Sequence, residues 1–74
     1  MLNAIFNYKG IETVIQCNKN EMMKEIINRY RTKEEIYPVY YLYNGGILNE
    51  ELRIEKIINK EDNKNNKMKI ILMI

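Results

Sequence analysis

The stretch Val39-Tyr40-Tyr41-Leu42-Tyr43-Asn44-Gly45-Gly46-Ile47-Leu48 decides the expected fold. Its first half is rich in aromatic and branched side chains, a composition typical of a β-strand. Asn44 and the two glycines after it can adopt the left-handed backbone conformations of a tight turn at little steric cost. Ile47 and Leu48 then begin a short returning strand. The stretch therefore predicts a strand, a tight turn and a second strand.

Another hairpin is predicted at the start of the chain. Apolar and polar side chains alternate through residues 2–8, which is the period-2 pattern of a half-buried strand. Lys9-Gly10 supplies the turn, and residues 11–17 alternate again as the second strand. Cys17 shares the alternation of Ile15, which predicts a small buried side chain. Ile5 and Val14 would form a small apolar spot on the outer face, and single apolar surface residues of this kind are normal.

One amphipathic helix is predicted between the two hairpins. Asn18 and Glu21 have the spacing of a capping box, and Asn20 is a competing N-cap residue. A stripe of apolar residues then recurs at the 3.6-residue period, which predicts the buried face of a helix: Met23, Ile26, Ile27 and Tyr30. Pro38 prevents the helix from continuing and favours an extended conformation at Tyr37.

The last third of the chain predicts irregular structure and then a final strand. The first part of this region is a charged segment with four apolar residues: Leu52, Ile54, Ile57 and Ile58. This pattern is typical of one 3₁₀ turn and a loop that packs over the end of the core. Residues 61–67 are predicted to form a mobile polar loop. Residues 68–74 are nearly all apolar, as expected of a central strand that is covered on one face.

This order of elements and two local segments resemble the ubiquitin-like family. The segments are Tyr40–Leu48, within which Leu42–Leu48 is similar to that family's third-strand hairpin, and the closing residues 66–72. The segment Asn44–Leu72 is especially similar to the divergent ubiquitin-like domains of single-celled eukaryotes. It implies one α+β domain over residues 1–74, a β-grasp with a mixed four- or five-stranded sheet wrapped around one α-helix.

Two departures from the family pattern bear on function. Ubiquitin-like modifiers end in a flexible tail with a terminal Gly-Gly, whereas this chain ends in the strand-like residues 70–74. We therefore expect either a domain of a longer protein or a modifier without its tail. The polar loop at residues 61–67 is the second departure.

Composition argues against several function classes. The chain has 12 basic and 10 acidic residues, and this net charge of +2 is too small and too dispersed for nucleic-acid binding. It has one cysteine and no histidine, so no nucleophile–base pair can be assembled, and we expect no enzyme. Neither a cofactor-binding motif nor a set of metal ligands is apparent. No apolar run has the length of a membrane span, and residues 1–7 lack the basic start and the long apolar core of a signal peptide, so we expect a cytoplasmic or nuclear location.

The candidate binding residues follow from strand alternation. If Tyr41 and Tyr43 point inward, then Tyr40 and Leu42 point outward. In the same way, if Met68 and Ile70 point inward, the alternate residues of the last strand point outward: Lys69, Ile71 and Met73. The predicted protein-binding residues are therefore Tyr40, Leu42, Gly45, Lys69, Ile71 and Met73. A one-residue slip in register would instead place these side chains in the core.

We therefore expect a monomeric, non-catalytic protein-interaction module. By family resemblance, its partner would be a ubiquitin-binding helix or a proteasomal receptor. Two alternatives stay open: a ubiquitin-like modifier lacking its tail, and a structural domain whose apolar sheet face packs against a neighbouring domain of the same chain.

Overall fold

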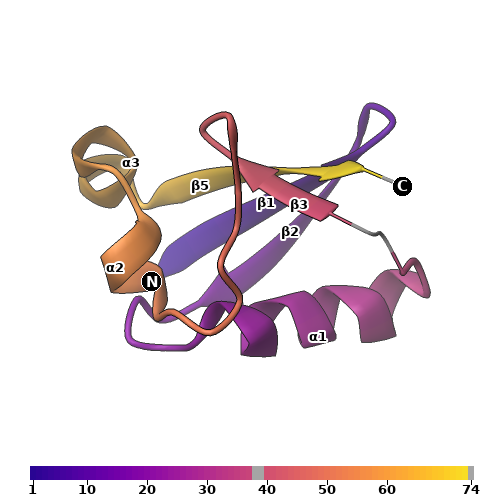
Figure 1. Ribbon diagram of the computed structural model, residues 1–74, viewed down its shortest axis with the longest axis horizontal. Helices are drawn as coiled ribbons and strands as arrows, with labels where there is room; N and C mark the ends of the chain where they lie inside the picture. The colour runs from indigo at the N-terminus through magenta and orange to yellow at the C-terminus, as the bar shows by residue number, and fades with distance from the viewer. Residues whose placement is uncertain (38–39, 74) are drawn as a thin grey trace.

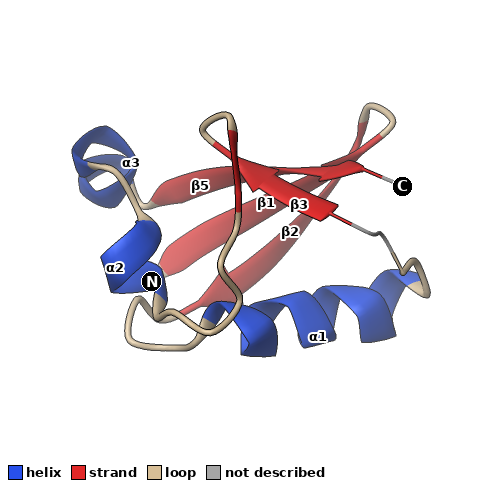
Figure 2. Ribbon diagram, viewed as in Figure 1, coloured by secondary structure: helices blue, strands red, loops and turns tan. Residues whose placement is uncertain are grey.

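The computed structural model describes residues 1–37 and 40–73. The elements follow the order β1 (Leu2–Tyr8), β2 (Ile11–Cys17), α1 (Met23–Glu34), β3 (Tyr40–Tyr43), β4 (Gly46–Ile47), α2 (Ile54–Ile57), α3 (Lys60–Asn65) and β5 (Lys67–Met73). The long helix α1 lies across one face of the sheet, and α2 and α3 lie together near one end of it (Figure 1). Figure 2 shows the resulting division into a strand layer and a helix layer.

The sheet has five strands in the order β2-β1-β5-β3-β4. The final strand β5 occupies the centre, where it pairs parallel to β1 and antiparallel to β3. Strand β5 thus lies between two hairpins, one made by β1 and β2 and the other by β3 and β4. A mixed sheet of this order that holds one helix against a single face is the ubiquitin-like β-grasp, which confirms the expected fold class.

Both hairpins turn on two residues with positive φ. Lys9 and Gly10 have φ of 52° and 86°, and Asn44 and Gly45 have φ of 52° and 83°. Two successive left-handed residues form the turn whose twist matches that of the flanking strands. The turn chemistry predicted at both positions is therefore confirmed.

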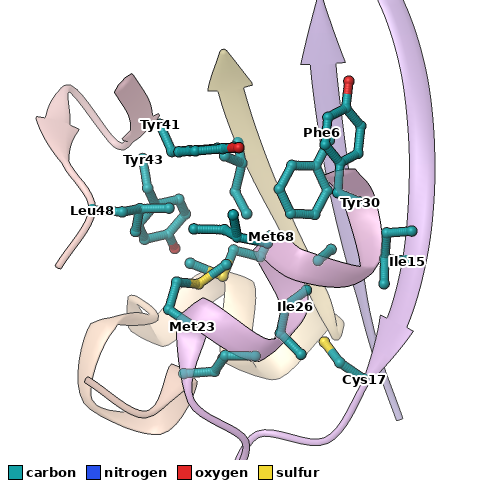
Figure 3. Packing of buried hydrophobic residues seen from close by; sticks show 14 of the residues in the cluster. Phe6, Ile15, Cys17, Met23, Ile26, Tyr30, Tyr41, Tyr43, Leu48 and Met68 are labelled. Atoms are coloured by element: carbon teal, nitrogen blue, oxygen red, sulfur yellow. The ribbon is translucent and has the colours of Figure 1, made fainter. Parts of the chain in front are cut away.

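The core lies between α1 and the sheet (Figure 3). The ring of Phe6 stacks on Tyr30 of α1 with 4.5 Å between centroids, and the ring of Tyr41 meets Phe6 edge-on at 6.3 Å. The predicted apolar stripe of the helix is buried, with exposures of 0–1%: Met23, Ile26, Ile27 and Tyr30. Cys17 is 1% exposed, and its thiol donates a hydrogen bond to the carbonyl of Leu2 at 3.7 Å. The side chains expected to form the core therefore do so.

The start of α1 differs from the prediction. Met22 holds the N-cap position without a side-chain hydrogen bond, so neither Asn18 nor Asn20 caps the helix. The segment before α2 takes over this task, because the N–H groups of Met23 and Lys24 donate to the carbonyls of Leu52 and Glu50 at 2.9 and 3.0 Å. Sequence spacing identifies local caps and misses carbonyl groups supplied by a distant loop.

The loop predicted at residues 61–67 is a second difference. Residues 60–65 form the helix α3, which Asn59 caps by accepting a hydrogen bond from the N–H of Asp62 at 2.8 Å. The preceding apolar segment forms the α-helical turn α2 and no 3₁₀ turn. Ile54 is fully buried, whereas Leu52 is 40% exposed and does not pack over the core as predicted. The predictions at Pro38, Val39 and Ile74 lie outside the described residues.

Candidate protein-binding surface

The orientation of β3 and β5 decides which side chains face outward. On β3, Tyr41 and Tyr43 are buried at 2% and 8% exposure, whereas Tyr40 is 50% exposed. On β5, the side chains alternate strictly between buried and exposed positions. The exposed ones include Lys69, Ile71 and Met73. The expected register is therefore confirmed, and the register slipped by one residue is wrong.

Strand pairing brings the outward residues together. Tyr40 lies opposite Met73, and Leu42 lies opposite Ile71. Residues that lie opposite each other in neighbouring strands project from the same face of a sheet. The exposed fractions of Ile71 and Met73 are 52% and 47%, so apolar surface is continuous across the two strands.

Ile47 extends this surface to the sheet edge. Ile47 belongs to β4, lies opposite Leu42 of β3 and is 67% exposed. We call the apolar group Tyr40, Leu42, Ile47, Ile71 and Met73 the outer-face patch; Leu42 is half-buried and the other four are exposed. The predicted residues do not include Ile47, although the sequence carried the signal: a two-residue turn at Asn44-Gly45 places Ile47 opposite Leu42.

A lysine borders the patch at one end. Lys69 lies two residues before Ile71 on β5 and is paired with Ile5 of β1. Ile5 is itself paired with Val14 of β2. The side chain of Val14 is 48% exposed, whereas that of Ile5 is only 9% exposed. The predicted Ile5–Val14 spot is therefore reduced to one side chain. Gly45 is exposed at the tip of the β3–β4 turn, beyond the side chains of the patch.

Hydrogen bonds beneath the patch hold β3 in place. The guanidinium of Arg31 on α1 donates to the phenol oxygen of Tyr41 at 3.1 Å, and burial raises the pKa of this phenol. Tyr43 is bonded to Asp62 and Asn59, and burial is the main cause that raises the pKa of Tyr43 to about 12. Both inward tyrosines are therefore neutral and anchored at neutral pH, which fixes the outward positions of their neighbours.

The chemistry available at this surface is hydrophobic contact with a positive charge at one end. Across residues 1–37 and 40–73, no three Cys, Asp or Glu side chains gather where they could hold a metal ion. Burial raises the pKa of the Cys17 thiol to about 11, which disfavours the thiolate. The described helices include none that is long and apolar enough to cross a membrane.

Comparison with known proteins identifies a similar fold in a larger protein. A solved structure of ATBAG1 in complex with HSP70 is similar to this chain, with a TM-score of 0.78 and 12% sequence identity. The match covers 99% of this chain and 40% of that chain, so this chain spans less than half the length of its structural neighbour. No protein-family model and no curated protein matches the sequence. At this identity, the similarity shows the fold alone.

Proposed function

We propose that this ubiquitin-like domain is a non-catalytic protein-interaction module that docks partners through the outer-face patch and its borders. The residues that carry the interaction are Tyr40, Leu42, Ile47, Ile71 and Met73, with Lys69 and Gly45 at the rim. The observation that supports this proposal most is the pairing of Tyr40 with Met73 and of Leu42 with Ile71, which joins three exposed apolar side chains and the half-buried Leu42 into one surface. Soluble domains keep such patches small unless the patches bind something.

The chemistry of the patch favours an amphipathic helix as the docking element. An apolar stripe on such a helix would cover the side chains of β3 and β5, and an acidic residue at one end would face Lys69. The ubiquitin-like fold adds an analogy to ubiquitin-binding helices and proteasomal receptors as the partner class. The complex of ATBAG1 with HSP70 supports, by the same kind of analogy, a protein partner in general.

The size of the patch suggests a transient interaction. Its five apolar side chains lie on three short strands of a chain whose longest dimension is 28 Å. Interfaces that bury less than about 1,200 Å² in total are typically weak, so we expect a dissociation constant in the micromolar range. In our proposal the domain acts as a monomer in the cytoplasm or nucleus and positions the remainder of a longer protein.

The test is an amide NMR titration of the ¹⁵N-labelled domain. The probes are a panel of ubiquitin-binding helices and a proteasomal receptor domain. We expect saturable shifts at residues 40–47 and 69–73 with at least one probe. Ile71→Asp should abolish them, because it places a charge at the centre of the patch.

Ile11→Asp is the matched control. Ile11 is 68% exposed at the β1–β2 turn, and it belongs to the alternation whose other members, Thr13, Ile15 and Cys17, point toward α1. The control should bind as the wild type does. Saturable shifts confined to α1 or β2 would contradict the proposal, and so would equal binding by the Ile71→Asp variant.

A further inference from the structure

The strand β4 has a free edge at Ile47. Tyr43 pairs with Gly46 across the two-residue turn, and the N–H of Leu48 donates to the carbonyl of Tyr41 at 2.8 Å. Hydrogen-bonded and non-hydrogen-bonded pairs alternate in an antiparallel ladder, so the pair between these two, Leu42 with Ile47, is non-hydrogen-bonded. The N–H and C=O of Ile47 therefore point away from β3. Because β4 is the last strand of the sheet, no strand within the described residues covers them.

A shallow cavity of about 330 Å³ adjoins this edge. It lies between the chain around β4 and the helix α2, and its apolar wall includes Ile47, Leu48, Leu52 and Ile57. The side chain of Leu52 is 40% exposed, although its own carbonyl and that of Glu50 accept hydrogen bonds from the first N–H groups of α1. A cavity of this volume is at the lower end of the range for ligand sites, and it has room for an aliphatic side chain.

A positive charge stands at the same cavity. Lys56 of α2 is one of the lining residues and is exposed. The ion pairs of the described residues are Lys24 with Glu51 and Arg29 with Glu21, so Lys56 has no carboxylate partner among them. A free ammonium group beside an apolar hollow favours a ligand that brings a carboxylate.

We propose that the β4 edge and this cavity form a second binding site, which accepts an extended peptide carrying an aliphatic residue next to an acidic one. The peptide main chain pairs with the free N–H and C=O of Ile47, as in strand addition to a sheet edge. Its aliphatic side chain enters the cavity against Leu52 and Ile57, and its carboxylate faces Lys56. The ligand is a strand, so the site differs in kind from the outer-face patch. The two sites share Ile47, but binding at the β4 edge does not depend on the patch binding a helix.

The test begins with a phage-displayed library of random dodecapeptides, selected against the wild-type domain. We expect enrichment of peptides with an aliphatic residue within two positions of Asp or Glu. Each enriched peptide is then synthesised and its affinity measured by fluorescence anisotropy. Leu52→Asp should weaken binding by about tenfold or more, because it places a charge in the apolar hollow.

Charge reversal tests the role of Lys56. Lys56→Glu should weaken binding of the acidic peptide by about threefold to fivefold, as expected of a surface ion pair. The same peptide with Lys in place of its acidic residue should bind Lys56→Glu better than it binds the wild type. Both substituted residues are exposed, and circular dichroism verifies that each variant remains folded.

Ile71→Asp separates this site from the outer-face patch. Peptides of the β4-edge site should bind this variant within about twofold of the wild type, because the charge lies on the sheet face and away from the cavity. Three results would overturn the proposal: no enrichment over the unselected library, equal binding by Leu52→Asp, or loss of binding in Ile71→Asp. Failure of helix docking in the NMR titration would leave these measurements unaffected.

Discussion

The phenol of Tyr43 on β3 donates a hydrogen bond of 2.5 Å to the carboxylate of Asp62 on α3. The same oxygen accepts a hydrogen bond from the N–H of Asn59 at 3.1 Å. Asn59 in turn caps α3 by accepting from the N–H of Asp62. These three residues form a closed network that fastens the α2–α3 segment to the strand whose outward side chains form the patch.

Replacing Tyr43 by Phe tests this network. The substitution keeps the ring but removes one donor and one acceptor, leaving the Asn59 N–H and the Asp62 carboxylate without this partner. We expect the free energy of unfolding to fall by about 1–3 kcal/mol, measured by urea denaturation. Tyr40→Phe is the matched control, because Tyr40 is half exposed and no hydrogen bond joins its hydroxyl to another described residue. Equal loss in the two variants would contradict the network.

The same phenol predicts a dependence of stability on alkaline pH. Burial raises the pKa of Tyr43 to about 12, from 10.0 for an ordinary tyrosine. Folding therefore favours the protonated form, and the contribution of Tyr43 to stability is fully present below pH 10. It is lost as the pH rises from 10 to about 12. We expect the free energy of unfolding to fall over this interval, and to fall less steeply in Tyr43→Phe. The residual slope of the variant reflects Cys17, Tyr30 and Tyr41, whose pKa values burial also raises.

Cys17 should be unreactive in the folded protein. The thiol is 1% exposed, and burial is the main cause that raises its pKa to about 11. At pH 8, Ellman's reagent should label native protein only as fast as the domain unfolds, and should label one thiol per chain at once in 6 M guanidinium chloride. Rapid labelling of the native domain would show that the β2–α1 side of the core opens.

Glycine substitutions test the β3–β4 turn that carries the patch to the edge. Gly45 has φ of +83°, and an added Cβ would meet no atom within 4 Å, so its replacement is costly only through backbone strain. We expect Gly45→Ala to lower the free energy of unfolding by about 1–2 kcal/mol. At Gly46, the φ angle is not in the left-handed region and the nearest atom to an added Cβ is 3.8 Å away. Gly46→Ala should therefore cost less, and a larger loss at Gly46 than at Gly45 would contradict the turn geometry.

Strand alternation and turn chemistry made much of this fold predictable from sequence. The two hairpin turns follow from local turn residues, and the buried stripe of α1 follows from its repeat of 3.6 residues. The central position of β5 follows from the high apolar content of its sequence. The outward orientation of Tyr40 and Ile71 followed from the strand repeat of 2 residues. Their binding role stays a prediction.

The differences arise where contacts between distant segments decide the structure. The first turn of α1 is capped by the carbonyls of Glu50 and Leu52, which no local motif near Asn18 could indicate. Helix α3 contains no buried residue, and polar contacts hold it: the Asn59 cap, the Tyr43–Asp62 bond and a hydrogen bond from Lys19 to the carbonyl of Asn63. It therefore shows no apolar period. The cavity beside Lys56 likewise depends on how α2 packs near β4, which the sequence pattern does not specify.

The most direct test of the outer-face patch as a docking surface is a comparison of affinities by isothermal titration calorimetry. The wild-type domain, Ile71→Asp and Ile11→Asp are each titrated with the helix or receptor domain that gives the largest NMR shifts. We predict a micromolar dissociation constant for the wild type and for Ile11→Asp, and a value at least about tenfold weaker for Ile71→Asp. Equal affinities for all three proteins would contradict the account.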